Sequence, residues 1–571
     1  MNYPIWDVPA GGLLIAAVAI VHVFVSHFAV GGGLFLVLAE QKARADADAA
    51  LLAFVRRLSR FFILLTLVFG ALTGVGIWFT IGLVHPAATS TLINIFVWAW
   101  AIEWTFFVAE IAAAMVYYYG WDRLSPRTHL AVGWIYFAAA WLSLAVINGI
   151  LSFMLTPGAW ITTRSVWDGF FNPTYWPSLV ARSFVAIGLA GLYALLIASW
   201  TRDAALKTQI ARYAGMTWVL PMAIALPLAI VWFLTAAAGA CAPMQEVFGA
   251  SSDQVGALLT AVVSGSQSGH PIAQRATLIA LVASILAAVV TVVFVLLRSQ
   301  QYGRVTTAVL MVLGLAAFGG AEFAREDMRK PFVIGQFMFV NGVRLPAAPG
   351  VPGPPLGSAA APGEDRLAVD ALNREGVLQT ALWRKDEGGE RAARGREIFR
   401  LQCRACHTED GYLAVRPLVR GMSAAAAGGL LSRLARPVDA AGEAVAWNDP
   451  NLHLTTWRGR RMPPFVGTAD ERRALALYLA VLGGASAESA DAAGVGEQYF
   501  EENCSACHGP DGDFQIGGRG RTVEALEEML ERLPAVNEMM PPFEGTDELR
   551  RAVAEYIATL DKPALPKDGG R

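Results

Sequence analysis

The chain is poor in charged residues. Only 16% of its 571 residues are Asp, Glu, Lys or Arg, and 55% are hydrophobic, whereas soluble domains usually carry about 25% charged residues. The formal net charge of -2 argues against a nucleic acid partner, which would need a strongly basic face. Five cysteines are too few for a disulfide scaffold. The opening residues 1–12 lack the basic segment of a cleaved signal peptide. The low share of charged residues, in particular, argues against an ordinary soluble protein.

Long apolar runs fill the chain up to about residue 324. Each run reaches or exceeds the ~20 residues that a helix needs to cross a bilayer core of about 30 Å. The predicted spans are 11–39, 60–84, 89–118, 128–155, 175–200, 210–238, 271–297 and 304–323. As buried helices of a soluble bundle they would need a very large soluble shell. The pattern therefore predicts a multi-pass domain of about eight helices in a lipid bilayer.

Lys and Arg gather in every second loop, and the alternate loops carry almost none. The rich loops are 40–60, 119–127, 201–213 and 298–304. Because loops rich in Lys and Arg stay in the cytoplasm, the N-terminus and everything after the eighth span are predicted to lie outside. The predicted location is a bacterial cytoplasmic membrane.

The composition changes after residue 335. Residues 344–363 are dense in Pro, Ala and Gly, which is typical of a semi-extended tether. Beyond them a weak repeat appears, in which a C-x-x-C-H motif is followed by an M-P-P-F segment and an amphipathic helix. The predicted units are a membrane domain at 1–335, a tether at 336–379, and two small helical domains at 380–484 and 485–571.

Both copies of the repeat carry the C-x-x-C-H pattern of covalent haem attachment. The residues are Cys403, Cys406 and His407 in the first copy, and Cys504, Cys507 and His508 in the second. Two thiols one helical turn apart can bond both vinyl groups of one haem, and the adjacent imidazole then lies under the iron. A zinc site or a redox dithiol does not explain why His follows both times. Two covalent haem c groups are predicted, and this half resembles two tandem class I cytochrome c domains.

One methionine in each copy precedes Pro-Pro-Phe: Met462 and Met540. A thioether opposite a histidine raises the potential of a haem, so these two are the predicted sixth ligands. Met422 and Met539 are the alternative ligands. A different interpretation is that Met462 and Met540 only pack in the cores of their domains. Haem attachment of this kind occurs outside the cytoplasmic membrane, in agreement with the loop charges.

Ionisable side chains inside membrane spans are costly and therefore suggest function. Here they are His22, His27, Glu103, Glu110, Arg182 and Glu322. At 1.5 Å rise per residue, His22 lies ~16 Å, Glu103 ~20 Å and Glu110 ~30 Å from the outer surface. We predict that Glu110 and Glu103 relay protons from the cytoplasm towards a haem on His22. The alternative without function is that an intramembrane histidine is a hydrogen-bonded core residue and that a glutamate at a helix end is simply solvated.

Over about residues 10–335 the chain resembles subunit I of cytochrome bd-type oxidases. The similar stretches are His22 to Glu40 ending in GGGLFLVLAEQ, AIEWTFFVAE followed by YYYGWDRLSPRTH, and AEFAR at 321–325. The resemblance implies one or two non-covalent membrane haems of b or d type, with His22 and Glu322 as axial ligands. It also implies Arg325 near propionates, Glu103 and Glu110 as proton conductors, and a second membrane subunit.

The chain departs from that family where a third haem and quinol would bind. The fifth span has no His, Thr277 stands where a Met is expected, residues 239–270 are too short for the quinol-binding loop, and a ninth helix is absent. The sequence leaves open whether His27, His85 or His270 replaces the lost ligands, and what Cys241 does.

The sequence thus predicts an all-α protein, a membrane helix bundle joined to two cytochrome c domains. The predicted activity is that of an oxidoreductase, a bd-like terminal oxidase reducing oxygen to water with cytoplasmic protons. A soluble or membrane-bound cytochrome c, or a respiratory complex, would supply the electrons. The alternatives are an electron-transfer subunit docked on a larger respiratory complex and a quinol:cytochrome c reductase. Haem-based gas sensing is a weaker alternative, since no signalling domain follows.

Overall fold

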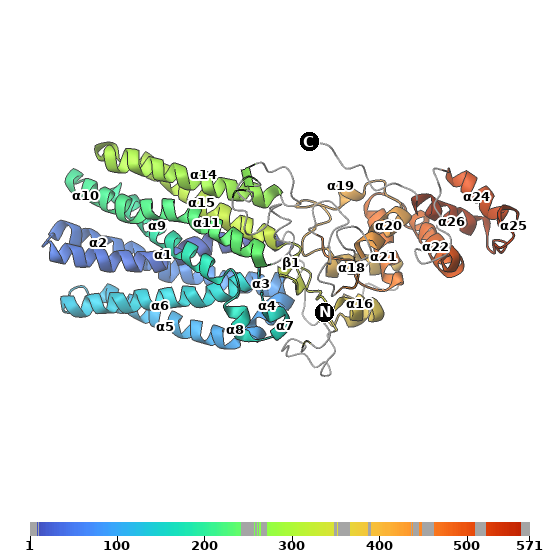
Figure 1. Cartoon of the computed structure of the whole chain (residues 1–571), viewed down its shortest axis with the longest axis horizontal. Coiled ribbons are helices and arrows are strands. Elements are labelled where there is room, and N and C mark those ends of the chain that lie inside the picture. The colour runs from blue at the N-terminus through green and yellow to red at the C-terminus, as the bar shows by residue number, and fades with distance from the viewer. Residues whose placement is uncertain are drawn as a thin grey trace.

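A computed structural model describes residues 8, 11–240, 256, 260, 262–263, 271–347, 351, 366–385, 390–435, 437, 445–447, 462–508 and 521–560. In this described part the chain is almost wholly helical, with one two-stranded antiparallel sheet. The membrane bundle occupies one end of the long axis, the first cytochrome c domain follows it, and the second lies farthest away (Figure 1). The predicted all-α architecture is confirmed.

Eight helical segments of the described part are long and apolar enough to cross a membrane. They are Gly11–Ala45, Ala49–Val84, Val97–Tyr119, Pro126–Phe153, Tyr175–Ala198, Ala204–Ala240, Ile272–Leu297 and Arg304–Arg329. The number of predicted spans is confirmed by helix length and composition, but the third begins at Val97 rather than at residue 89, because Pro86–Ile95 form a separate helix. The second begins earlier than predicted, because the amphipathic stretch from Ala49 continues into the apolar run as one helix.

Several spans contain more than one helical element. The elements of the bundle are α1 (Gly11–Ala45), α2 (Ala49–Ile63), α3 (Ala71–Val84), α4 (Pro86–Ile95), α5 (Val97–Tyr119), α6 (Pro126–Phe153), α7 (Trp160–Thr163), α8 (Val166–Phe170), α9 (Tyr175–Ala198), α10 (Ala204–Ala214), α11 (Leu220–Ala240), α14 (Pro271–Val290) and α15 (Arg304–Arg329), with π-helical turns at Leu64–Gly70, Gly215–Val219 and Thr291–Leu297 and a 3₁₀ turn at Ser299–Gln301. Local chemistry sets some of these boundaries: α6 begins where Ser125 accepts a hydrogen bond from the Thr128 amide at 3.3 Å, with Pro126 at its first position.

Helix α1 packs closely against α9 and α6 in the middle of the bundle. A Cβ atom on Gly31 would lie 1.8 Å from the Ala186 carbonyl oxygen of α9, and one on Gly33 would lie 2.3 Å from the Tyr136 ring of α6. The glycines therefore permit a backbone approach that no larger residue allows. This contact fixes the depth of the histidines that precede it on α1.

The two cytochrome c domains repeat one helix crossing. Helix α18 (Arg391–Gln402) crosses α21 (Ala469–Leu482) in the first domain, and α22 (Ala487–Asn503) crosses α26 (Asp547–Leu560) in the second. A Cβ on Gly395 would lie 1.9 Å from the Ala474 carbonyl oxygen, and one on Gly496 would lie 2.1 Å from that of Ala552. Glycines at the same position of the two repeat copies thus allow equivalent close crossings. The remaining elements are α16 (Val369–Glu375), α17 (Val377–Thr380), α19 (Arg416–Val419), α20 (Ala424–Ala435), α23 (Ser505–His508), α24 (Val523–Glu531) and α25 (Leu533–Val536).

Both ends of the segment predicted as a tether are packed. Strand β1 (Phe332–Ile334) pairs with β2 (Met338–Phe339), and the amide of Arg344 donates to the Leu367 carbonyl at 2.8 Å. Side chains from residues 332–343 share one apolar cluster with side chains of 367–381 and with Leu401 of α18. Residues 348–350 and 352–365, which include most of the Pro-rich part, lie outside the described residues. The first cytochrome c domain is therefore held against the bundle by its flanking segments.

The start of α1 lies at the same end of the bundle as the cytochrome c domains (Figure 1). The four loops rich in Lys and Arg join α1 to α2, α5 to α6, α9 to α10 and the span of α14 to α15, and all lie at the opposite end. An even number of spans places the two ends of the membrane domain together, as predicted.

Candidate functional site

The first haem-attachment motif lies between its own domain and the membrane bundle. Cys403 packs against the core of the first cytochrome c domain. Ala405 and Cys406 instead pack against an apolar cluster at the end of the bundle, which includes Phe96, Phe153, Trp160 and Phe337. The Ala405 carbonyl oxygen is 4.0 Å from the position of a Cβ on Gly12, in the first turn of α1. The covalent haem of this motif would therefore border the membrane domain.

His407 has the hydrogen bond expected of an axial ligand. Its Nδ1 lies 3.0 Å from the Leu413 carbonyl oxygen and can only donate to it. The proton on Nδ1 leaves the lone pair of Nε2 free for iron, the arrangement in which metal-binding histidines are commonly held. The residues present thus fit a c-type haem on Cys403, Cys406 and His407.

The second motif begins directly after α22 and its last four residues form α23, in the domain that lies farthest from the bundle (Figure 1). Cys504 packs against the core of its domain, whereas Cys507 is exposed. Of the two adjacent methionines, Met540 is half-buried and Met539 is 82% exposed. The inward side chain of Met540 suits a ligand better. In the first domain Met462 is 37% exposed, while Met422 packs with Cys403 against the core, so both stay candidates.

Alanine at both predicted sixth ligands should remove the thioether–haem bonds. In the full-length Met462→Ala, Met540→Ala variant we expect the ferric absorption band at about 695 nm, which reports methionine ligation, to vanish, with both haems still covalently attached. Optical spectra of the oxidised protein test this. The matched Met422→Ala, Met539→Ala variant should keep the band, and loss of the band in that control instead would transfer the ligand role to those residues.

His22 is oriented as a ligand inside the membrane domain. Its Nδ1 is 3.1 Å from the Thr73 hydroxyl, which itself donates to the Phe69 carbonyl at 2.7 Å. The hydroxyl must therefore accept from Nδ1, so that Nε2 is free. Gly74 faces the imidazole and leaves room beside it. His22 fits the predicted haem, and it lies about 15 Å along α1 from Gly12, which borders the first haem motif.

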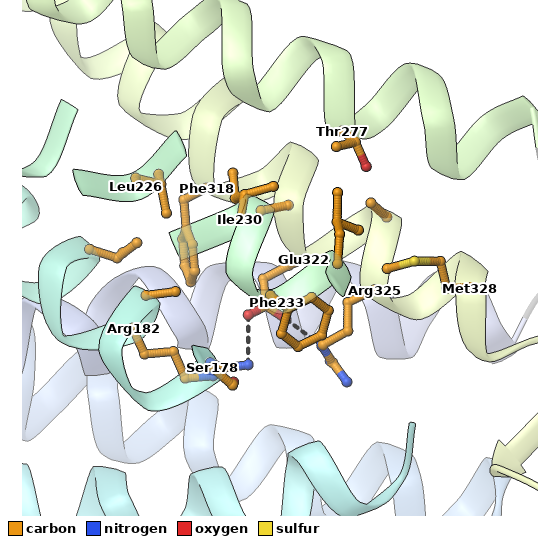
Figure 2. A pocket seen from close by; sticks show the side chains of 15 residues that line it. Ser178, Arg182, Leu226, Ile230, Phe233, Thr277, Phe318, Glu322, Arg325 and Met328 are labelled. Atoms are coloured by element: carbon orange, nitrogen blue, oxygen red, sulfur yellow. Dashed lines mark hydrogen bonds and ion pairs between the residues drawn. The ribbon is translucent and has the colours of Figure 1, made fainter. Parts of the chain in front are cut away.

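Glu322 lies in a buried ion-pair cluster (Figure 2). Its Oε1 is 2.6 Å from Nη2 of Arg182, and its Oε2 accepts from Nε of Arg325 at 3.0 Å. Nη1 of Arg182 is 3.4 Å from Nε2 of His27. The structure thus joins four ionisable residues that the sequence placed on three separate spans.

The cavity beside Glu322 does not fit a haem in this arrangement. Its volume is about 60 Å³, and Thr277, Phe318 and Met328 are among its lining residues. Both carboxylate oxygens of Glu322 already contact arginine. Arg325, predicted near propionates, pairs with Glu322 instead. Haem ligation by Glu322 stays a prediction, and no step is derived through it.

Glu103 and Glu110 both face α6. Glu103 accepts from the Ser143 hydroxyl at 3.0 Å, and Glu110 lies 2.9 Å from the Tyr136 hydroxyl. That hydroxyl is also 3.0 Å from the Ala29 carbonyl, which can only accept. Because Tyr136 has one hydroxyl hydrogen, both contacts are satisfied together when the carboxyl of Glu110 carries a proton. The geometry suits a group that gains and loses a proton.

A second carboxylate cluster lies nearer the end opposite the cytochrome c domains. Glu40 is fully buried and is contacted by Tyr117 Oη at 2.7 Å, Arg44 Nε at 2.7 Å and His129 Nδ1 at 2.9 Å. The Nε2 of His129 is 2.9 Å from the Tyr117 carbonyl. Both ring nitrogens face acceptors, so an imidazolium satisfies every contact. Glu40 and His129 stand in the sequence motifs that resemble bd-type oxidases, but the sequence predicts no role for them, since their pairing is visible only in three dimensions.

The remaining candidate residues from the sequence are His85, Cys241 and His270. His85 lies between α3 and α4 at the cytochrome c end, and burial lowers its pKa to about 4. His85 is thus neutral at physiological pH. Cys241 and His270 lie outside the described residues.

Comparisons with known proteins agree with both halves. Residues 13–249 match the family model of cytochrome bd terminal oxidase subunit I. Residues 390–479 and 491–557 match that of cytochrome C oxidase, cbb3-type, subunit III, one segment for each copy of the repeat. The structure of bd oxidase from Geobacillus thermodenitrificans is similar at 15% identity and a TM-score of 0.49, covering 57% of this chain and 87% of that chain. No curated protein matches. The predicted resemblance is confirmed: a membrane domain similar to bd oxidase subunit I is joined to cytochrome c domains, as in a membrane-bound respiratory haem protein.

Proposed function

We propose that this protein is a terminal oxidase fed by cytochrome c. Electrons enter at the second cytochrome c domain, pass to the first, and cross to a haem held by His22, where oxygen is reduced to water. The observation that carries this proposal is the contact of Cys406 and Ala405 with the membrane bundle, one short stretch of α1 away from His22. The haems supply the redox chemistry, and the chain supplies their ligands, their spacing and the protons.

The order of the electron carriers follows from packing. The two cytochrome c domains share an apolar cluster in which Ala424 and Leu477 of the first meet Phe500 and Val553 of the second. Arg472 and Arg473 of α21 both pair with Glu501 of α22, the latter at 2.9 Å. Because the first domain alone carries a haem motif against the bundle in the described part, the second is the point of entry.

Three carboxyl groups support a proton route from the opposite end. Glu40 lies beside Tyr117, Glu110 is seven residues nearer the cytochrome c end on α5, and Glu103 is seven residues farther on. Each interval is about 10 Å, which water molecules must bridge. The direction of this series supports protons arriving from the cytoplasm.

The charge of the loops and the haem chemistry support the same orientation. The Lys- and Arg-rich loops lie opposite the cytochrome c domains, which by the positive-inside rule supports an outer location for those domains and the N-terminus in a bacterial cytoplasmic membrane. Covalent haem attachment occurs on that side. A second membrane subunit, which the family suggests, would cover part of the bundle.

Oxygen uptake by the purified protein with different donors tests the proposal. We expect uptake with a reduced soluble cytochrome c and none with a quinol, because the 239–270 segment is too short for the family's quinol-binding loop and Thr277 stands where the Met ligand of the family's third haem is expected. Uptake on quinol alone would contradict a cytochrome donor. Reduction of cytochrome c by quinol would establish the reductase alternative. If the c haems are reducible but neither donor supports oxygen uptake, the protein would be an electron-transfer subunit of a larger complex.

A further inference from the structure

The two cytochrome c domains carry opposite charge. Residues 390–482 contain 14 Lys or Arg and 9 Asp or Glu, a formal charge of +5, whereas residues 491–560 contain 5 and 15, a formal charge of −10. Net charge of one sign on a domain steers charged partners and raises their association rate. The second cytochrome c domain therefore favours association with positively charged partners.

Part of this acidic charge surrounds the second haem motif. The ring of Tyr499 of α22 packs at a tilt against that of Phe543, with centroids 4.7 Å apart, and the Tyr499 hydroxyl accepts a hydrogen bond from the Glu544 amide at 3.1 Å. This contact brings the loop that carries Met540 against the end of α22, where Glu502 precedes Cys504. Glu538 lies at the other side of the two methionines. The carboxylates of Glu502, Glu538 and Glu544, here called the acidic rim, thus flank the attachment motif and the ligand loop.

The acidic rim is exposed, and its only hydrogen bond from another side chain among the described residues comes from Gln498 to Glu502 at 2.9 Å. All three side chains are exposed, and within the described residues none of them takes part in an ion pair. Met539, which lies between Glu538 and Glu544 in this loop, is 82% exposed and adds an apolar group next to the predicted haem ligand Met540. An apolar centre at a redox group with a charged rim suits a small, transient electron-transfer interface.

We propose that the acidic rim docks a small soluble one-electron donor protein whose redox centre is ringed by Lys or Arg. The proposal rests on the proposed function, in which electrons enter at the second domain. One electron leaves the reduced donor and reduces the haem attached at Cys504 and Cys507, and no covalent bond forms or breaks. Its position at the end farthest from the bundle leaves this face open to a soluble protein (Figure 1).

The test compares a basic class I cytochrome c with an acidic one of similar size. Stopped-flow reduction of the c haems by the basic donor should fall at least about tenfold between roughly 10 mM and 500 mM salt, because screening removes the steering. The acidic donor should react slowly at low salt and faster as salt rises. A rate with the basic donor that does not depend on salt would overturn the proposal.

Two triple variants with the same change of charge locate the surface. Glu502→Gln, Glu538→Gln, Glu544→Gln should lower the low-salt rate at least about fivefold and weaken binding of a redox-inactive, zinc-substituted basic cytochrome c by a similar factor. Glu524→Gln, Glu528→Gln, Glu531→Gln, exposed acids on α24, should change both less than about twofold. Equal losses in the two variants would contradict docking at the acidic rim.

A small-molecule reductant separates this proposal from the proposed function. Oxygen uptake driven by a diffusible phenylenediamine needs no protein docking, so the acidic-rim variant should keep the parent rate. Uptake with that reductant but no salt-sensitive binding of the basic cytochrome would overturn the docking surface alone. No uptake with the reductant in the parent protein would overturn the oxidase proposal, while binding of the zinc-substituted cytochrome would still test the surface.

Discussion

Replacing His22 by alanine is expected to remove one non-covalent haem and to abolish oxygen uptake, while both c haems remain attached and reducible. His22 is the imidazole whose Nδ1 is fixed by Thr73 and whose Nε2 is free. Without it, the haem loses its axial bond inside an apolar bundle. A pyridine haemochrome count of extractable and covalent haem measures the loss directly.

Two companion measurements show whether the effect is ligation. Exogenous imidazole should restore part of the lost haem absorption in His22→Ala, because it can enter the space left by the side chain. Thr73→Val should keep the haem but shift its potential, since the hydrogen bond that fixes the tautomer of His22 is gone. An unchanged extractable haem content in His22→Ala would show that His22 is not an axial ligand.

Glu110→Gln and Glu103→Gln should each slow oxygen reduction at least tenfold, about 1.4 kcal/mol of barrier. Glutamine keeps the size of the side chain and can still hydrogen-bond to Tyr136 or Ser143, but it cannot release a proton at neutral pH. Haem content and the rate of c-haem reduction should stay unchanged. Oxygen-electrode rates with a reduced cytochrome c, compared with stopped-flow reduction of the c haems, separate the two steps.

Neighbouring substitutions serve as controls for the relay. Thr105→Val lies on the exposed side of α5, where its hydroxyl bonds only to the Ala101 carbonyl of its own helix among the described residues, and should keep the parent rate. Tyr136→Phe removes the hydroxyl beside Glu110 and should give an intermediate rate. Parent rates in both glutamine variants would show that the glutamates are structural, and would favour an electron-transfer subunit.

The membrane helices and the haem-attachment motifs could be predicted from short segments of the sequence. Apolar runs longer than 20 residues have few alternatives to membrane helices, and each C-x-x-C-H motif contains all the protein atoms that attach a haem. The repeat predicts two similar domains, and the structure shows equivalent close helix crossings at Gly395 and Gly496, the first residues of the two copies. These features depend on residues close together in the chain.

Contacts between distant segments could not be predicted in this way. The ion pairs of Glu322 join α15 to Arg182 of α9, and Glu40 of α1 meets His129 of α6; both depend on helix rotation, which the uniformly apolar spans do not reveal. The Pro-rich composition suggested a tether, yet its flanks pack into a cluster that holds the first cytochrome c domain on the bundle. The sequence around Tyr136 does not indicate a role for this residue; only the structure shows its hydroxyl beside Glu110.

In the proposed function, electrons run from the c haems to a haem on His22 and then to oxygen. Rapid mixing of the fully reduced protein with oxygen, followed through the absorption of the reduced c haems, tests it most directly. We predict that in the parent protein both c haems are oxidised within the turnover time, and that in His22→Ala they stay reduced. Oxidation of the c haems at the same rate in both proteins would contradict it, because the electrons would then reach oxygen without that haem.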